Sequence, residues 1–416
     1  MSNVFGNLVF GIFDSLRTSS FQINYGNEGF RLVMSLLDFV KSARTSKTDM
    51  GVDAFLKSLS PFLSSKIKEV PSGEIERWIT SAVTTLNSKD FTYEVLFEGM
   101  KGIKSPQDSY FLYHDCVYEL IASQIPSDPN NTISFPTDNF GMTSRNILGE
   151  KDYSRLDVHT YNRDNNEYVG ILGRLFDFPV NVHQGWAVTN PLTENRALVQ
   201  YDVVIDAPPI GTRQAISDTI KKSDPFNRFS GDHQNHDGLY FLQHDIASLK
   251  ADGKAFFLTG AGMLFMTGKA AETRQSIVES DHIEAVIALP TGSSLFTKAS
   301  MDLIICNKNK PDNRKGKILM MEIDSTEAEL KQYTDILANW QDMDEVASIV
   351  TVEEIKENDW NLEPKTYIAK SASFTKPHET LVSIHEKLEL LHAKEKALHQ
   401  SFQEAMKTIL EQDNQQ

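Results

Sequence analysis

The chain has 416 residues, of which 40% are hydrophobic, so it can hold two or three domains with at least one sizeable core. Asp and Glu outnumber Lys and Arg by 57 to 41, and the net charge of −16 opposes tight unaided binding to nucleic acid phosphates. Having only Cys116 and Cys306 argues against a disulfide framework, and no stretch reaches the roughly 18 apolar residues of a membrane span, so a cytoplasmic protein is expected.

The first part of the chain, residues 1–105, is predicted to be a helical N-terminal domain. Apolar side chains recur there at intervals of three and four, which is typical of amphipathic helices. One such face comprises Phe30, Leu32, Val33, Leu36, Leu37, Phe39 and Val40, and a second comprises Phe55, Leu56, Leu59 and Phe62. A further helix is expected over residues 109–124, because the same spacing continues until Pro126 ends it.

From about residue 131 to residue 310, short β-type runs alternate with helical segments. The β-type runs begin at Thr132, Leu156, Val180, Tyr201, Ala255, Ile283 and Met301, and the helical segments cover residues 168–176, 239–249 and 271–279. This alternation predicts a doubly wound, mostly parallel α/β sheet in a domain of residues 106–370. Residues 239–290 give the clearest unit, in which a helix capped by Gly253 leads to a strand, a crossover helix and a second strand. A later strand over residues 315–323 and a helix over residues 329–340 complete the domain.

The last segment, residues 371–416, is predicted to be one long helix. Its apolar positions form a coiled-coil seam over residues 381–409 that only Glu395 interrupts. A terminal helix of this length cannot bury such a stripe by itself. It can fold back on its own domain or pair with another chain, and we favour pairing with a partner.

The loop that follows Tyr201-Asp-Val-Val-Ile205 is the first candidate site. The strand is a short β-branched run, and Asp206, Ala207, Pro208, Pro209 and Ile210 follow it. Two prolines make this loop rigid and extended. Ligands bind at the carboxyl ends of strands in open α/β sheets, although the same residues also suit a plain turn.

Three segments in the second half of the chain carry a resemblance to a known family. They are residues 227–244, with the sequence NRFSGDHQNHDGLYFLQH, residues 249–258, with LKADGKAFFL, and residues 283–296, with IEAVIALPTGSSLF. In this order and spacing, the chain over residues 105–370 resembles the modification subunit of type I restriction-modification systems. Those subunits are adenine-specific DNA methyltransferases that use S-adenosylmethionine. The resemblance implies a methyltransferase-type sheet, a helical N-terminal domain, and C-terminal helices that dock on a specificity subunit.

The catalytic positions implied by the resemblance are altered here. The family has an Asn-Pro-Pro-Phe or Asn-Pro-Pro-Tyr loop, which accepts a hydrogen bond from the target amine and stacks on the flipped base. Aligned on Pro208 and Pro209, this chain has Ala207 and Ile210 instead. Alanine cannot accept that bond and isoleucine cannot stack as a ring does, although Asp206 could substitute as the acceptor if the loop shifted.

The cofactor loop implied by the resemblance is also altered. The family has an Asp-Pro-x-Cys-Gly-x-Gly-Gly segment after the first strand, and glycines there let the backbone approach the cofactor. The corresponding residues 135–142 contain Pro136, Asp138 and a single glycine, Gly141.

Two further cofactor positions differ. Where the family has an acidic residue for the ribose hydroxyls, this chain has Asn162, with Asp164 nearby as a possible replacement. Where the family has a Gly-Asp pair near the adenine of the cofactor, this chain has Gly185 and Trp186.

These replacements predict a subunit that retains the fold but has lost catalysis and S-adenosylmethionine binding. It would act as a binding or scaffolding protein of a bacterial DNA modification or defence complex, with residues 381–409 contacting a specificity-like or methyltransferase partner. The alternatives are an active adenine methyltransferase with divergent motifs and an interaction module acting on a nuclease or toxin. His233 and His236 are read as part of a solvated loop and not as metal ligands. Arg174, Arg213 and Arg228 either contact DNA phosphates within such a complex or pair with the abundant carboxylates.

Overall fold

The fold is taken from a computed structural model, in which residues 3–18, 27–101, 112–138, 141–161, 166–210, 223–230, 238–295 and 298–368 are described. Met1–Ile368 form one compact unit. The second unit, Ala369–Gln416, lies outside the described residues, and so does the predicted seam over residues 381–409. Among the described helices, none combines the length and the apolar character that crossing a bilayer requires.

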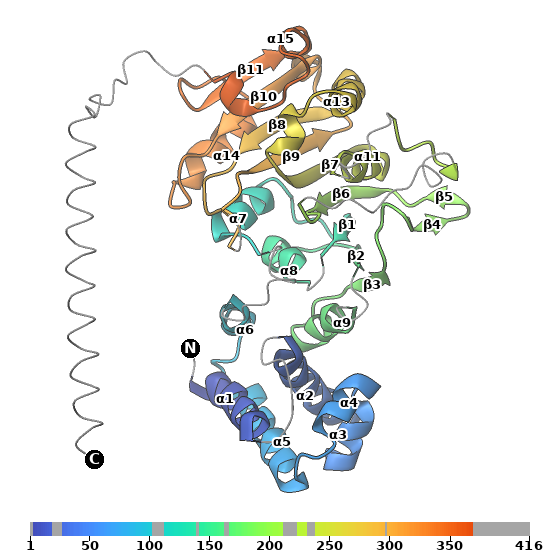
Figure 1. The fold of residues 1–416 in the computed structure, drawn as a ribbon, viewed down its shortest axis with the longest axis vertical. Coiled ribbons are helices and arrows are strands. Elements are labelled where there is room, and N and C mark those ends of the chain that lie inside the picture. The colour runs from blue at the N-terminus through green and yellow to red at the C-terminus, as the bar shows by residue number, and fades with distance from the viewer. Residues whose placement is uncertain are drawn as a thin grey trace, which may run out of the picture. The chain divides into compact units, whose positions relative to one another are not determined.

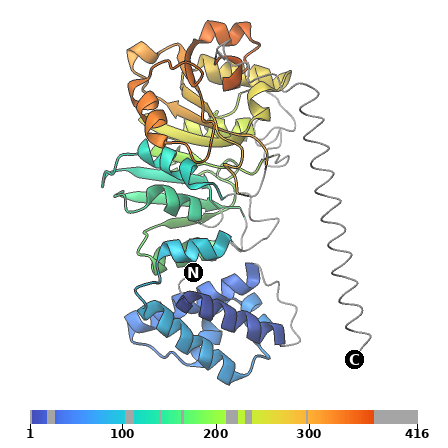
Figure 2. The same ribbon diagram turned by 90° about the vertical axis from the view of Figure 1, so that its left-hand side faces the viewer.

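The N-terminal region is helical, as predicted (Figures 1 and 2). Its helices are α1 (Asn3–Thr18), α2 (Asn27–Ser46), α3 (Val52–Ser58), α4 (Pro61–Ile67), α5 (Ser72–Asn87) and α6 (Tyr93–Lys101). Helices α1 and α2 both pack against α5. The second predicted apolar face is not one helix, because the chain breaks between α3 and α4. There the Ser60 hydroxyl accepts a hydrogen bond from the Leu63 amide, Pro61 occupies the first turn, and Phe62 is exposed.

The centre of the α/β region is a nine-stranded sheet in the order β11-β10-β8-β9-β7-β6-β1-β2-β3. Strands β1, β2, β3, β6, β7, β8 and β10 run parallel to one another, and β9 and β11 run antiparallel to their neighbours. The strands are β1 (Thr132–Thr137), β2 (Arg155–Thr160), β3 (Asn181–Gln184), β6 (Tyr201–Asp206), β7 (Leu249–Gly260), β8 (Ile283–Ala288), β9 (Met301–Asn307), β10 (Lys317–Glu322) and β11 (Ala347–Thr351). A short hairpin of β4 (Thr193–Glu194) and β5 (Ala197–Leu198) lies between β3 and β6 in the chain. The predicted mostly parallel α/β sheet is therefore confirmed.

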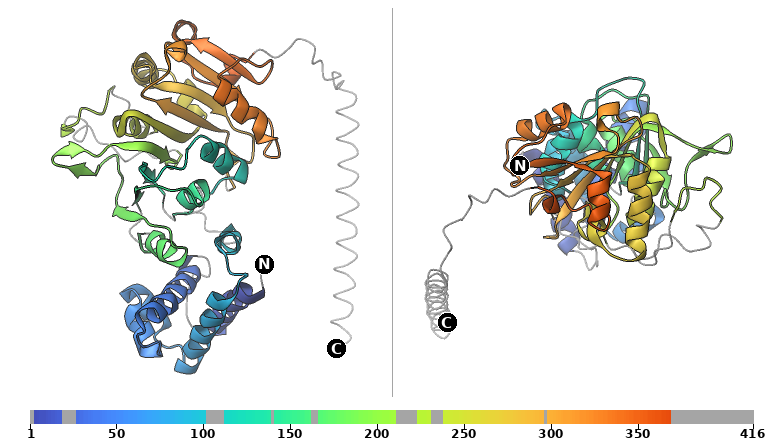
Figure 3. Two further views of the ribbon diagram at one scale, coloured as in Figure 1. Left: turned by 180° about the vertical axis from the view of Figure 1, so that it is seen from behind. Right: turned by 90° about the horizontal axis from the view of Figure 1, so that it is seen from above.

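Helices cover both faces of this sheet, and each face has its own apolar core (Figures 1 and 3). One core includes residues of α7 (Asp115–Ser123), α8 (Met142–Leu148), α9 (Asn166–Leu175) and α14 (Leu330–Asn339). The other includes residues of α11 (Gly238–Ala247), α12 (Gly262–Phe265), α13 (Lys269–Glu279) and α15 (Val352–Glu357). Because helices cover both faces of the sheet, β8 and β9 are buried along their whole length. Such strands have mostly apolar sequences without alternation.

Several details differ from the sequence-based expectation. Gly253 does not cap a helix, because α11 ends at Ala247 and Gly253 lies inside β7. It is required there by a close approach, since a Cβ at this position would lie 2.8 Å from the Tyr201 carbonyl oxygen. The helix expected over residues 109–124 begins at Asp115 among the described residues, where the His114 side chain caps it. Strand β11 and helix α15 were not foreseen.

Candidate functional site

The reversal of strand order places the candidate site between β1 and β6. From β1 the chain continues outward through β2 and β3, then returns to β6 on the other side of β1. Crevices at such reversals, at the carboxyl ends of the strands, bind ligands in open α/β sheets. Thr137 at the end of β1 pairs in register with Asp206 at the end of β6, so the two predicted loops do begin side by side.

In the loop after β1, a side chain of the loop itself forms a hydrogen bond with the helix that follows. Pro136 lies within β1, and the pairing of β1 with β6 is irregular there, as expected for a residue with no N–H. The buried Asp138 carboxylate accepts a hydrogen bond of 2.7 Å from the Ser144 amide in the first turn of α8. Gly141 precedes α8 with φ of +68°, and a Cβ there would lie 3.1 Å from the Val169 side chain. The one remaining glycine is thus required by the backbone.

Two aromatic rings lie together at the ends of β2 and β3. The indole of Trp186 stacks on the ring of Tyr161, with centroids 4.2 Å apart and planes 5° from parallel. Trp186 also makes an edge contact with Phe241 of α11 at 5.4 Å. Gly185, with φ of +103°, donates a hydrogen bond from its amide to the Thr160 carbonyl and so fixes the turn that carries the indole. Asn162 and Asp164 lie outside the described residues.

Sequence reasoning singled out Trp186 but missed its partner Tyr161. The strand register brings the two rings together, because Thr160 pairs with Gln184 and both rings follow these positions within two residues. The sequence alone does not give that register.

The loop after β6 turns its predicted catalytic positions in opposite directions. Ala207 and Pro208 are buried, and Ala207 belongs to the apolar core. Ile210 is 51% exposed and lies over Gly260 at the end of β7. A Cβ added to Gly260 would lie 3.2 Å from the Ile210 side chain. Pro209 is half-buried between them. The loop therefore presents an aliphatic side chain to the surface, and no hydrogen-bond acceptor at the Ala207 side chain.

Beneath this loop lies a buried pair of carboxylates. Asp206 and Asp245 of α11 are fully buried, and none of their four carboxylate oxygens has a hydrogen-bond partner among the described residues. Burial raises the pKa of Asp206 to about 7, against the smaller opposing effects of the nearby Thr137 hydroxyl and the Ala207 amide. Burial and the charge of Asp206 raise the pKa of Asp245 well above its ordinary value. Because two like charges cannot both ionise cheaply in an apolar site, the pair retains a proton near neutral pH.

Sequence reasoning named Asp206 and missed Asp245. Nothing in the spacing of the two residues, 39 positions apart in the chain, signals that they lie close together.

The histidine face of β2 is ordered by a carboxylate network. Burial by itself opposes ionisation of Asp157, but hydrogen bonds from His183 at 2.9 Å and Tyr201 at 2.8 Å hold its pKa at about 2. Burial, with the neighbouring His183, lowers the pKa of His159 to about 4. His159 is therefore neutral at physiological pH.

Two of the three arginines named as DNA-contact candidates are paired. Arg174 makes two hydrogen bonds to Asp38, at 2.9 and 2.7 Å, and Arg228 makes two to Asp224, at 3.0 and 2.8 Å. Arg213, His233 and His236 lie outside the described residues, and the described part of the chain has no group of three or more acidic, His or Cys side chains fit to hold a metal ion. Of the two readings of Arg174 and Arg228, pairing with carboxylates is the one observed.

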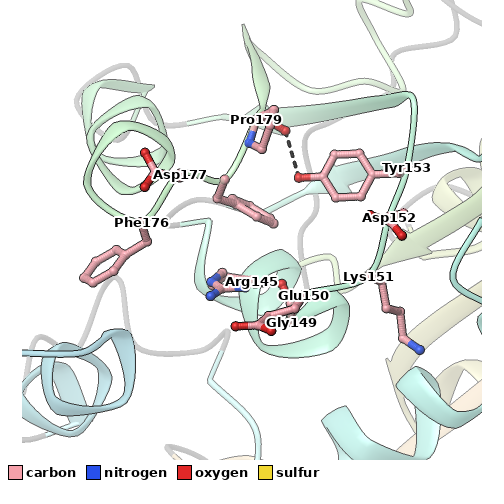
Figure 4. A pocket seen from close by; sticks show the side chains of 10 residues that line it. Arg145, Gly149, Glu150, Lys151, Asp152, Tyr153, Phe176, Asp177 and Pro179 are labelled. Atoms are coloured by element: carbon pink, nitrogen blue, oxygen red, sulfur yellow. Dashed lines mark hydrogen bonds between the residues drawn. The ribbon is translucent and has the colours of Figure 1, made fainter. Parts of the chain in front are cut away.

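A separate hollow of about 340 Å³ lies at the opposite edge of the sheet, before β2 and β3 (Figure 4). Its lining mixes the cations Arg145 and Lys151 with three acids, Glu150, Asp152 and Asp177. The Tyr153 hydroxyl closes one side by donating a hydrogen bond of 2.9 Å to the Pro179 carbonyl. This hollow shares no residue with the loops at the carboxyl edge.

Comparison with known proteins agrees with this architecture. The family model described as N-6 DNA Methylase matches residues 176–375. The chain is 25% identical over 327 residues to the Type I restriction enzyme MjaVII methylase subunit of Methanocaldococcus jannaschii, an alignment that covers 69% of this chain and 55% of that protein. It is 31% identical over 147 residues to the HindI methylase subunit of Haemophilus influenzae, covering 31% of this chain and 33% of that protein.

Solved structures show the same fold. The type I restriction-modification methyltransferase subunit of Streptococcus thermophilus superposes with a TM-score of 0.66 at 14% identity, covering 88% of this chain and all of that one. The chain is similar to the type I modification subunits. The chain spans about half the length of the MjaVII methylase subunit. The predicted resemblance to type I modification subunits and the predicted methyltransferase-type fold are confirmed.

Proposed function

We propose that this chain is a type I modification-subunit-like protein that does not methylate DNA and that serves as a binding or scaffolding subunit of a DNA modification or defence complex. The observation that carries the proposal is the Tyr161–Trp186 stack at the carboxyl ends of β2 and β3. The family resemblance implies a carboxylate at the position of Trp186, near the adenine of the cofactor. Because the Tyr161 and Trp186 rings are in van der Waals contact, they fill the position where the cofactor adenine would lie.

The loops after β1 and β6 support the same proposal. The Asp138 carboxylate accepts a hydrogen bond from the Ser144 amide at the start of α8. Of the family's three glycines only the second has a counterpart, Gly141, and Asn139 and Met142 stand at the other two positions. At the end of β6, Ala207 offers no side-chain acceptor and Ile210 no ring. These residues do not fit S-adenosylmethionine or a flipped adenine.

Calorimetric titration of the full chain with S-adenosylmethionine tests the loss of cofactor binding. We expect no saturable heat at micromolar concentrations. A Trp186→Asp chain, which restores a carboxylate and removes the stack, should bind at least tenfold more tightly than a Trp186→Phe control, which keeps an aromatic ring. Micromolar binding by the unaltered chain would contradict the proposal. Equal affinity of the two variants for S-adenosylmethionine would show that the Tyr161–Trp186 stack is not the cause of the lost binding.

One observation favours an active methyltransferase as the second candidate. Asp206 is a carboxylate without a hydrogen-bond partner among the described residues, one position before the family's acceptor position. A shift of the loop by one residue would bring it to the surface as the acceptor. Radiolabelled methyl transfer to DNA by a reconstituted complex, abolished by Asp206→Ala, would establish this candidate. Absence of transfer in every reconstituted complex would rule it out.

The partner assignment rests on the C-terminal seam. We infer that residues 381–409 contact a specificity-like or methyltransferase subunit, because their spacing suits a coiled coil. Co-purification of tagged full-length chain with such a subunit, compared with a chain ending at residue 376, tests the assignment. Complex formation that survives the truncation would show that the contact lies elsewhere.

A further inference from the structure

A second hollow, of about 370 Å³, lies at the amino edge of the sheet, away from the carboxyl-edge loops. Its walls come from the last turns of α11 and α13, which pack against each other, and from residues 226–230. His282, immediately before β8, and Lys308, immediately after the antiparallel β9, also line it. Its volume falls within the roughly 300–1,000 Å³ range of small-molecule sites.

The charge of this hollow is opposite to that of the chain as a whole. Its lining contains Arg228, Lys308 and His282 but no aspartate or glutamate, in a protein whose net charge is −16. The hollow of Figure 4, by contrast, has more acids than bases in its lining. Since Arg228 is paired with Asp224, the excess positive charge in this lining is that of Lys308.

The positive charge at Lys308 is not balanced by the protein. Arg228 is neutralised by Asp224, and both side chains are almost fully buried. The Lys308 ammonium donates a hydrogen bond of 2.7 Å to the neutral Leu249 carbonyl and forms no ion pair within the described residues. Burial lowers the pKa of Lys308, and burial together with Lys308 lowers the pKa of His282. Both effects indicate a half-buried cation that an anion would stabilise.

The remaining lining suits a phosphate group attached to an apolar body. Ser276 of α13 and Asn227 supply neutral hydrogen-bonding groups. Phe226, Phe229 and Ile277 supply apolar surface, and Phe229 is held by the Arg228 guanidinium 4.6 Å above its ring. We propose that this hollow binds a small aromatic phosphomonoester, with its phosphoryl group between Lys308 and His282 and its body against residues 226–229.

Titration calorimetry on the full chain with phenyl phosphate, inorganic phosphate and benzyl alcohol tests this proposal. Phenyl phosphate should bind at least tenfold more tightly than benzyl alcohol, because only the former carries the dianion. Inorganic phosphate should bind detectably but more weakly than phenyl phosphate, because it lacks the apolar body. Equal affinity for benzyl alcohol, or no heat with phenyl phosphate at millimolar concentrations, would overturn the proposal.

Variants locate the site. Lys308→Met should lower the affinity for phenyl phosphate at least tenfold, whereas Lys315→Met, at an exposed lysine paired with Asp312, should leave it unchanged. His282→Gln removes a second anion ligand without altering Lys308, and it provides the test if the Lys308 variant does not fold. Unchanged affinity in Lys308→Met or in His282→Gln would overturn the proposal. Because the Trp186 variants alter a different edge, failure here is distinguishable from failure of the proposed function.

Discussion

At the residue scale, the carboxylate pair beneath the β6 loop is costly to bury in its ionised form. Four carboxylate oxygens without partners among the described residues are costly unless a proton neutralises them. The burial of Asp206 follows from its place in the chain, since it occupies the last position of a buried strand whose neighbours Ile205 and Ala207 belong to the core.

The raised pKa of Asp206 makes stability depend on pH. An unfolded aspartate has a pKa of about 3.9, so the stability conferred by the raised folded pKa is complete below about pH 4 and is lost as the pH rises toward 7. Each pKa unit corresponds to about 1.4 kcal/mol, so the loss is on the order of a few kcal/mol. Asp206→Asn cannot ionise, and its melting temperature should fall less between pH 5 and pH 8 than that of the unaltered chain.

The matched control is Asp312→Asn, at an exposed aspartate paired with Lys315. That variant should keep the full decrease of melting temperature between pH 5 and pH 8. An Asp206→Asn chain with the same decrease would show that this carboxyl does not titrate in the folded protein over this range.

Gly141 tests whether the β1 loop is constrained by its backbone. A side chain at φ of +68° costs roughly 1–2 kcal/mol, and the new Cβ would also press on Val169. Gly141→Ala should therefore lower the unfolding free energy by at least that amount in denaturant titrations. Gly73→Ala, in α5 with no atom within 4 Å of the new Cβ, should be neutral or stabilising. Similar effects of the two substitutions would contradict this account.

At the scale of elements, the sequence predicted most of the sheet and little of its contacts. Runs such as residues 283–288 and 301–307 are mostly apolar because helices cover both sheet faces, so their type could be predicted from the sequence. Gly253 was wrongly predicted to be a helix cap, because a glycine after an apolar helix is typical of one. In the structure it is a glycine of β7, where a Cβ would collide with the Tyr201 carbonyl oxygen of the neighbouring strand. Tyr161 and Asp245 were missed for the same reason, since their partners are distant in the chain.

Ion pairs join the N-terminal helices to the α/β region. Arg174 of α9 forms its two hydrogen bonds with Asp38 of α2, and Lys41 pairs with Asp177 at 3.1 Å. Because Arg174 is half-exposed, the coupling between Arg174 and Asp38 should be modest, about 0.5–1 kcal/mol in a double-mutant cycle of Arg174→Met and Asp38→Asn. It should decrease in 1 M salt through screening. A coupling that is zero at low salt would mean that apolar contacts alone hold α2 against α9.

At the scale of the whole molecule, charge limits what the isolated chain can do with DNA. A net charge of −16 repels phosphates, and Arg174 and Arg228 are neutralised by Asp38 and Asp224. We expect duplex DNA to bind the isolated chain weakly in fluorescence anisotropy at 50 mM salt, and not measurably at 200 mM, because counterion release drives any binding that occurs. A partner that supplies basic surface should restore binding, and adding a specificity-like subunit is the comparison that tests this. Submicromolar binding by the chain alone at 200 mM salt would require a basic surface outside the described residues, and would turn the proposed scaffold into a DNA-binding protein in its own right.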